Sequence, residues 1–320
     1  MQINFVYVYP YPFLGPLLDA EHTVQGLTFH SRQIYPPFKL FGELVDASPY
    51  ELAEMSLSTY TLLRQQGWDN YVALPIFTSR CFRHSSLWVR ADSDIVNGAQ
   101  LKGRRVGIPE YHMTAAVWVR GFLKDDFDVD PREIAWFTGG VDEPGRRERL
   151  ELPASLGVKV SPIGAGETLF GMLTDGRLDA ALAPNLPKQN LAQIRRLFPN
   201  CLAVERAYYR RHGVFPIMHT IVLRKDVHQG NLEIAARIFA IFRSAKEEFY
   251  RKVAVVDRTY IFPWMYSYLS DLRAVLGDDP FPYGLERNRK NIEKYFDHAV
   301  EQSLIPVRPK LSELFLELND

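Results

Sequence analysis

Cysteine is scarce in this chain of 320 residues, which contains only Cys81 and Cys201. Two cysteines so far apart form no disulfide framework, and their spacing is not that of a zinc site. A surplus of positive charge is also missing, because 38 Lys and Arg residues balance 38 Asp and Glu residues. We therefore expect no nucleic-acid partner, since nothing would neutralise a phosphate backbone.

Long apolar runs and an early positive charge are absent as well. No run approaches the roughly 20 apolar residues of a membrane span, so we expect no membrane partner. The first basic residue is Arg32, whereas a secretory signal begins with a positive region. The segment Met1–Tyr9 instead resembles an opening strand, with Ile3, Phe5 and Tyr7 on one face. We infer a cytoplasmic protein.

Motifs for nucleotides and for activated nucleophiles are missing too. Gly139-Gly140 forms neither a dinucleotide fingerprint nor a phosphate-binding loop. Ser85-Ser86 lacks the glycines of a nucleophile elbow. Because His and acidic residues are scattered along the sequence, we expect no metal.

Strand-like and helix-like segments alternate along the chain, and its last hundred residues are mainly helical. Such alternation predicts an α/β fold with mixed, mostly parallel sheets and helices on both faces. The predicted strands are Ile3–Tyr9, Leu27–His30, Tyr50–Met55, Val72–Phe77, Ser86–Arg90, Arg104–Ile108, Ile134–Phe137, Val158–Ser161, Leu178–Ala183 and Thr220–Leu223. The predicted helices are Pro37–Val45, Ser58–Gln66, Thr114–Lys124, Glu167–Thr174, Leu191–Phe198, Leu232–Val253 and Glu286–Leu304.

Two segments repeat the same order of elements, and one loop carries many charges. Phe38–Met55 and Glu167–Ala183 each contain a helix, a turn and a strand, which suggests two similar lobes. Gly176 is well placed for a left-handed residue after the second of these helices. The charged segment Gly139–Arg149 is predicted to be a solvated connection.

The segment Leu101–Leu123 is the most informative one. It predicts a short buried strand, a polar loop and a helix that opens at Thr114, whose hydroxyl would cap it. The first turn of such a helix favours an anion, so Thr114 is a candidate carboxylate binder. The loop also contains Glu110 and His112, which a plain anion site does not need. Both residues are therefore candidates for the site, the alternative being loop residues that face water.

Five segments, in this order, resemble the 4,5-dihydroxyphthalate decarboxylase family: AEMSLSTY (Ala53–Tyr60), RCFRHSSLWVR (Arg80–Arg90), LKGRRVGIPEYHMTAAVWVRGFL (Leu101–Leu123), IAWFTGG (Ile134–Gly140) and VFPIMHTIVLR (Val214–Arg224). The resemblance implies the two-lobed fold of type 2 periplasmic binding proteins. Lobe I would be residues 1–100 and 220–320, lobe II would be residues 101–219, and the ligand would lie in the cleft. The implied partner is a small aromatic carboxylate.

The activity that the resemblance implies is cofactor-independent loss of CO2 from a hydroxylated aromatic acid. The lead substrate is 4,5-dihydroxyphthalate, which would give protocatechuate. Direct loss of CO2 would leave a ring carbanion with no electron sink, so the ring carbon must first be protonated. The site then needs an acid near that carbon, an acceptor for the phenol proton, and cations or N–H groups for carboxylates.

These requirements select the candidate residues. His84 or His219 would be the acid, and the other histidine or Glu110 would accept the phenol proton. The substrate-binding candidates are Arg32, Arg83, Ser85, His112, Thr114 and Ser58. Each has a structural alternative: His219 lies in an apolar run typical of a hydrogen-bonded core residue, Arg32 is a potential surface charge, and Ser58 is a potential helix cap.

Two other functions stay open from the sequence. One is a protein that binds a small anion without reacting with it. The other is a different small-acid enzyme on the same scaffold. The sequence also leaves open whether the chain forms a homo-oligomer.

Overall fold

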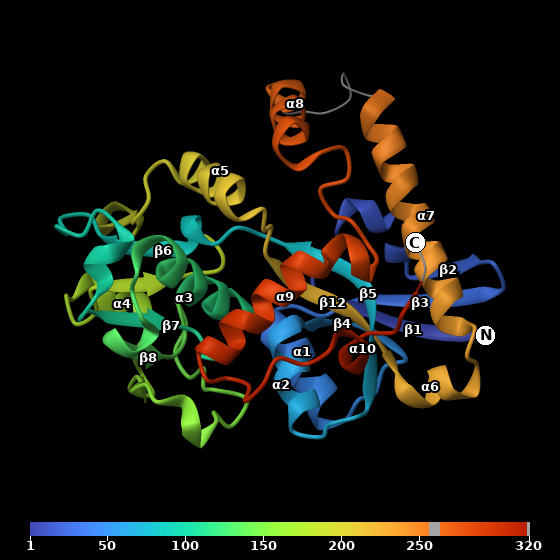
Figure 1. The fold of residues 1–320 in the computed structure, drawn as a ribbon, viewed down its shortest axis with the longest axis horizontal. Helices are drawn as coiled ribbons and strands as arrows, with labels where there is room; N and C mark the ends of the chain where they lie inside the picture. The colour runs from blue at the N-terminus through green and yellow to red at the C-terminus, as the bar shows by residue number, and fades with distance from the viewer. Residues whose placement is uncertain (256–262, 319–320) are drawn as a thin grey trace. The chain divides into compact units, whose positions relative to one another are not determined.

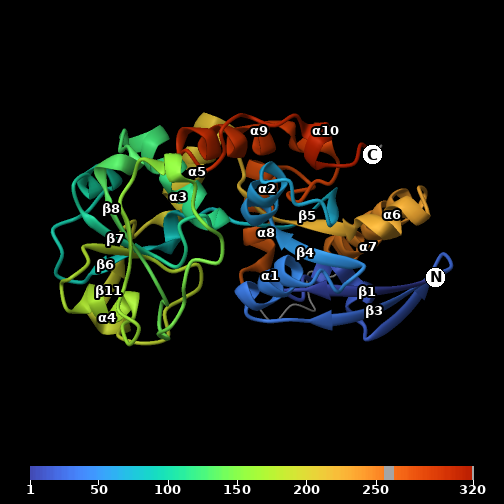
Figure 2. The ribbon, with the colours of Figure 1, turned by 90° about the horizontal axis from the view of Figure 1, so that it is seen from below.

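The computed structural model describes residues 1–255 and 263–318. Two compact units make up the chain. The first consists of Met1–Arg80, Ile217–Arg289 and Pro309–Asp320, and the second of Cys81–Pro216 and Lys290–Arg308. Each unit contains a six-stranded sheet, and the strands can be followed in Figures 1 and 2.

The sheet of the first unit has the strand order β2-β3-β1-β4-β12-β5. Its strands are β1 (Gln2–Tyr7), β2 (Glu21–Val24), β3 (Leu27–Gln33), β4 (Leu52–Ser56), β5 (Tyr71–Arg80) and β12 (Ile217–Arg224). β1 lies parallel to β3 and β4, whereas β12 runs antiparallel to β4 and β5. The carboxyl ends of the parallel strands and the start of β12 therefore meet at one edge of the sheet.

Apolar side chains on β1 anchor the core of this unit. Ile3, Phe5 and Tyr7 are buried, as the alternation predicted. They pack in one cluster with α7 (Ile234–Val255), which is seen beside the strands in Figure 1. The remaining helical segments of the unit are η1 (Pro12–Leu18), α1 (Pro37–Asp46), α2 (Leu57–Gln65), α6 (Lys225–Gly230), α8 (Met265–Leu276) and α10 (Leu311–Leu314).

The sheet of the second unit has the order β11-β6-β10-β7-β8-β9. Its strands are β6 (Leu87–Arg90), β7 (Arg105–Ile108), β8 (Ala135–Thr138), β9 (Val160–Pro162), β10 (Ala180–Leu182) and β11 (Ile194–Arg196). β10, β7, β8 and β9 are parallel neighbours, and β6 is antiparallel to β10 and β11. The helical segments are η2 (His84–Ser86), η3 (Gly98–Leu101), α3 (Thr114–Phe127), η4 (Pro131–Glu133), η5 (Ala154–Leu156), α4 (Leu169–Thr174), η6 (Leu191–Gln193) and α5 (Cys201–His212). α9 (Leu285–Glu301) begins in the first unit and ends in the second.

The unit boundaries differ from the predicted lobes. Residues 81–100 were expected in lobe I, but β6 completes the sheet of the second unit by pairing with β10 and β11. Residues 290–308 also belong to the second unit. Residues 217–219 were expected in lobe II, but they start β12, a strand of the first sheet.

The α/β class and most elements were predicted correctly, but β2 and α5 were not predicted. The predicted helix Leu191–Phe198 is wrong, because Ile194 pairs with Arg90 and starts β11. The sheets are mixed, but they are not mostly parallel as predicted. Parallel strand pairs are no more frequent than antiparallel pairs, because β2, β5, β6, β11 and β12 all pair with antiparallel neighbours. Gly176 has a φ of 74° directly after the end of α4, as predicted. Within residues 1–255 and 263–318, no helix combines the length and apolar character needed to cross a membrane.

Candidate active site

A buried carboxylate holds His219 in the first unit. His219 pairs in register with Ser56 of β4, and Glu54 lies two residues before Ser56. The side chains of Glu54 and His219 are thus diagonal neighbours across an antiparallel pair. His219 Nδ1 lies 2.6 Å from Glu54 Oε1. Glu54 is fully buried while 12% of the His219 side chain is exposed, so Nε2 is the ring nitrogen left for proton transfer.

Two further donors fix the Glu54 carboxylate. The Val8 amide donates to Oε2 at 2.8 Å, and the Tyr11 hydroxyl donates to Oε1 at 2.8 Å. Burial and then the negative charge of Glu54 raise the pKa of Tyr11 well above its ordinary range. Tyr11 therefore stays protonated and remains a donor, which leaves Glu54 in one orientation toward His219.

Aromatic rings set the plane of the His219 imidazole. Tyr9 stacks parallel to it at a centroid distance of 6.5 Å, and Phe41 of α1 meets it edge-on at 5.1 Å. The register between β12 and β5 shifts on both sides of His219. Such irregularities re-aim side chains and are frequent beside active sites. His219 is thus a preoriented imidazole rather than only a core residue.

The amino end of α2 adjoins His219 in the sheet. β4 ends at Ser56, which pairs with His219, and α2 begins at Leu57. The Thr59 amide donates to Ser56 Oγ at 3.3 Å, so the helix cap is Ser56 and not Ser58, which is buried in the first turn. A helix N-terminus favours an anion, so this edge of the first unit suits a carboxylate.

Arg32, a predicted carboxylate binder, lies exposed near the end of β3. Its guanidinium donates to the Tyr50 hydroxyl at 2.7 Å, and that hydroxyl donates to Glu43 at 2.6 Å. Arg32 is therefore a surface cation that is linked to Glu43 through the Tyr50 hydroxyl. A ligand carboxylate would add a stronger partner than the neutral hydroxyl.

In the second unit, Glu110 is fully buried and bound by two arginines. Arg146 donates to Oε1 at 2.8 and 2.6 Å, and Arg149 donates to Oε2 at 2.8 Å. Burial raises the pKa of Glu110, but the guanidiniums outweigh it and hold that pKa below its ordinary value. Part of Gly139–Arg149 is therefore pinned to the loop after β7, while Glu143–Gly145 and Arg147 are exposed. The prediction of a solvated connection was correct only in part.

His112 belongs to the same cluster. Its Nδ1 lies 2.6 Å from Glu148 Oε1, and its Nε2 lies 3.4 Å from Glu110 Oε2. The amides of Tyr111 and His112 also donate to Glu148, at 2.8 and 3.1 Å. Glu110 and His112 thus lie together, and both are buried rather than exposed to water.

Thr114 starts α3, but it is not the cap. The cap residue is Met113, and no side chain caps this helix. Thr114 is buried in the first turn. The expected hydroxyl cap was wrong because the helix begins one residue earlier than a cap at Thr114 would require.

Arg83, His84 and Ser85 lie directly before β6, at the 3-10 turn η2. Arg83 precedes the 3-10 turn η2, and its guanidinium donates to the Pro184 carbonyl at 3.1 Å. The Ser85 amide donates to Glu205 at 3.2 Å. The Arg83 guanidinium and the Ser85 amide thus both bond within the second unit.

The His84 ring lies in an aromatic cluster and is 1% exposed. It stacks on Phe122 at 3.9 Å and contacts Phe198 and Tyr208. Neither ring nitrogen has a hydrogen-bond partner among the described residues. Burial lowers the pKa of His84 to about 4, so the ring is neutral near pH 7 and poorly suited to donate a proton. This geometry opposes the predicted role of His84 as the acid.

Known proteins support a specific family for this chain. A 4,5-dihydroxyphthalate decarboxylase of Comamonas testosteroni is 32% identical over 311 residues, covering 95% of this chain and 93% of that protein. A second protein of the same name, from Pseudomonas putida, is 40% identical over 179 residues, covering 55% of this chain and 68% of that protein. The chain belongs to the 4,5-dihydroxyphthalate decarboxylase family. The predicted resemblance is confirmed, although no general family model matches the sequence.

Solved structures support the two-lobed fold expected of this decarboxylase family. The periplasmic aliphatic sulphonate binding protein SsuA of Escherichia coli has a TM-score of 0.55 at 13% identity, covering 99% of this chain and 92% of that chain. A variant of DSZB in complex with biphenyl-2-sulfinic acid has a TM-score of 0.52 at 14% identity, covering 99% and 96%. The predicted periplasmic-binding-protein-like fold is confirmed.

Sequence reasoning missed the partners of the site residues in this family member. Neither Glu54 nor Tyr11 was among the candidate residues. An acid inside the apolar strand LAEMS was the available signal, because a buried carboxylate needs hydrogen-bond partners. No group of three or more His, Cys, Asp or Glu residues suited to a metal ion occurs within the part of the chain that the structure describes.

Proposed function

We propose that this protein decarboxylates 4,5-dihydroxyphthalate to protocatechuate and CO2, which makes it a carbon–carbon lyase acting on a small aromatic carboxylate. Membership of the decarboxylase family supports the reaction. The structural observation that carries the proposal is the pair Glu54–His219, in which a fully buried carboxylate holds an imidazole whose side chain is 12% exposed. The predicted cytoplasmic location and the predicted ligand position between the lobes stay predictions.

In the proposed reaction, protonated His219 gives its Nε2 proton to the ring carbon that bears the departing carboxylate. Electron density from the hydroxyl para to that carbon supports this step. The C–C bond to the carboxylate then breaks, its electron pair returns to the ring, CO2 leaves and aromaticity is restored. His219 takes up a proton from solvent for the next turnover.

Glu54 is a positioning residue in this scheme. Its carboxylate binds Nδ1, which directs Nε2 toward the substrate and stabilises the imidazolium. The α2 N-terminus and Arg32 are the proposed carboxylate binders of the first unit. Of the two histidines predicted as candidate acids, the proposal keeps His219, because burial keeps His84 neutral near pH 7.

The test is turnover by the purified full chain, followed by release of CO2 and formation of protocatechuate. His219→Asn should lower kcat on the order of 10²-fold or more. Glu54→Gln should lower kcat less than that, with KM little changed, because it disturbs the orientation of His219 and not the binding of substrate. His30→Asn is a matched control, because His30 faces Glu21 at 3.7 Å but with 34% of its side chain exposed.

Three outcomes decide the proposal. Turnover that falls in His219→Asn but not in His30→Asn supports it. If no turnover is seen, with or without added divalent metal ions, 4,5-dihydroxyphthalate is excluded as the substrate. If the acid binds and is recovered unchanged, the protein is a binding protein for a small anion, which is the alternative that the sequence left open.

A further inference from the structure

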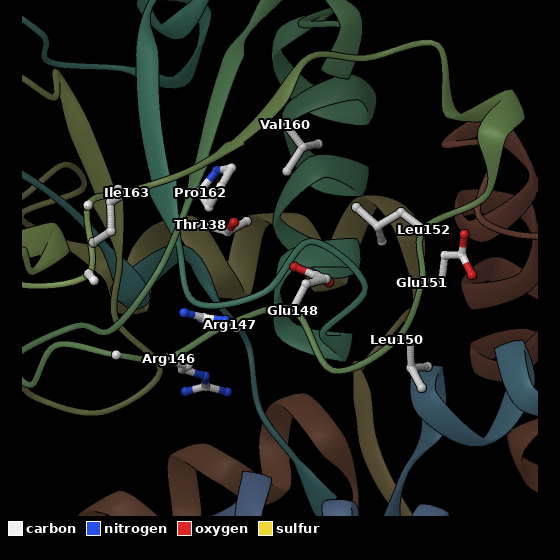
Figure 3. Close-up of a pocket in the computed structure, with 13 residues that line it drawn as sticks. Thr138, Arg146, Arg147, Glu148, Leu150, Glu151, Leu152, Val160, Pro162 and Ile163 are labelled. Atoms are coloured by element: carbon white, nitrogen blue, oxygen red, sulfur yellow. The ribbon is translucent and has the colours of Figure 1, made fainter.

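The second unit contains a cavity of about 620 Å³ that the proposed reaction does not use. It opens at the carboxyl ends of β8 and β9, the edge where α/β sheets generally bind ligands. Its volume lies within the range of small-molecule sites. Figure 3 shows its lining, which includes Thr138, Arg147, Glu148, Leu152, Val160 and Ile163.

One wall of the cavity is the charged loop that Glu110 and His112 hold. Arg146 and Arg149 bind buried Glu110, and Glu148 binds His112, so the loop is fixed at several points. The cavity is therefore bounded by ion pairs rather than by a loosely solvated turn. Such a wall provides a preformed site, which lowers the entropic cost of binding.

The chemical groups at the cavity define the ligand. Arg147 is exposed, and no hydrogen bond or ion pair involves it within residues 1–255 and 263–318. Leu152 and Val160 point toward each other across the space in Figure 3, and with Leu150 and Ile163 they form an apolar lining. An apolar ring with one carboxylate for the guanidinium satisfies both features.

Acidic groups at the same cavity restrict the charge of the ligand. Glu148 is 18% exposed, and its Oε2 accepts one bond, from the Tyr111 amide, so it retains capacity for a hydroxyl donor. Glu151 lines the cavity as a second carboxylate. Four charged side chains line the cavity, Arg146, Arg147, Glu148 and Glu151, and their formal charges cancel. A dianion would gain little there, whereas a monoanion with hydroxyl groups matches Arg147 and Glu148.

We propose that this cavity is a binding site for a hydroxylated aromatic monocarboxylate, with Arg147 as the carboxylate anchor and Glu148 as the hydroxyl acceptor. The identity of the acid rests on the proposed function, because protocatechuate, the proposed product, belongs to this class. The site then binds product after CO2 has left, and product accumulation would occupy it.

The experiment is calorimetric titration of the full chain with 3,4-dihydroxybenzoate (protocatechuate). Arg147→Ala should weaken binding about 10-fold or more, and Arg147→Lys should restore part of it. Leu152→Trp should weaken binding by filling the cavity without touching the ion pairs. Lys159→Ala, an exposed cation on the same unit and outside the lining, is the matched control. Catechol, which lacks the carboxylate, and benzoate, which lacks the hydroxyls, should each bind at least about 10-fold more weakly.

The outcomes separate this site from the proposed function. If Arg147→Ala and Leu152→Trp, each folded by circular dichroism, bind 3,4-dihydroxybenzoate as the parent chain does, the cavity site is refuted even where dihydroxyphthalate is turned over. If binding depends on Arg147 and Leu152 but no turnover occurs, the cavity site stands and the proposed reaction fails. Equal weakening by Lys159→Ala would also refute the site, because general charge would then explain the affinity.

Discussion

Replacing Glu110 with Gln should destabilise the second unit strongly. The substitution keeps the shape of the side chain but removes its charge, and its amide group then faces a guanidinium. Glu110 is fully buried and accepts bonds from Arg146 and Arg149. Removing one partner of a buried ion pair costs about 3–5 kcal/mol. The arginine side chains are 22% and 19% exposed, so water can solvate them in part and we expect the lower end, about 3 kcal/mol.

The effect of this substitution should depend on pH in one direction. Because the two guanidiniums hold the pKa of Glu110 below its ordinary value, the folded carboxylate stays charged longer than the unfolded one as the pH falls. The stabilisation is fully present above the unfolded pKa and is lost as the pH falls through the folded pKa. The difference in the free energy of unfolding between the parent chain and the variant should therefore be constant from neutral pH to about pH 5 and shrink below about pH 4.

Thermal and urea unfolding, followed by circular dichroism, measure this difference. A loss of about 3 kcal/mol corresponds to a lower melting temperature by about 6–12 °C for a unit of this size. Glu151→Gln is the matched control, since Glu151 is exposed near the same loop. A change below about 0.5 kcal/mol at neutral pH, which is ordinary for a surface substitution, would refute the reasoning. So would a difference that grows as the pH falls.

Two further substitutions test other buried contacts. Gly121→Ala should destabilise the protein by about 1–3 kcal/mol in a thermal melt, because its Cβ would overlap the buried ring of His298. Gly42→Ala in α1 is its control and should be neutral or stabilising, as nothing lies within 4 Å of that Cβ; equal effects would contradict the clash. The parent chain should lose stability as the pH falls from 6.5 to about 4, because the unfolded but not the folded His84 takes a proton in this range. His84→Phe should abolish this loss. The gain should reach about 3 kcal/mol near pH 4 in urea titrations, and identical pH profiles would show that His84 is not the group responsible.

Local patterns predicted most elements, and tertiary pairing explains the exceptions. The alternation over Met1–Tyr9 gave a correct strand because one face of β1 is buried against α7. The segment Leu191–Phe198 has apolar residues at helical spacing, yet Ile194 completes the sheet edge beside β6. The sequence of the segment itself does not show that β6 has an edge free for pairing, so β11 could not be predicted from local patterns.

The site residues were easier to predict than their partnerships. His219 and Glu110 were both selected, but their partners lie far away in the sequence: Glu54 is 165 residues from His219, and Arg149 is 39 residues from Glu110. A single sequence shows which residues carry chemistry but not which of them meet. The charged loop Gly139–Arg149 shows the same limit, because its composition is that of a solvated turn while its arginines bind a buried acid.

The two buried glutamates, Glu54 and Glu110, differ in what surrounds them, and that difference decides their roles. Glu110 was predicted to accept the phenol proton, but both of its oxygens already bind guanidiniums, which favour its charged form. A carboxylate held in this way is a weak proton acceptor and a good anchor for a loop. Glu54 binds neutral donors and His219 instead, so its charge acts on an imidazole that retains a second nitrogen. These surroundings favour His219, held by Glu54, for the proposed proton transfer, and they favour Glu110 for holding the loop that forms the cavity wall.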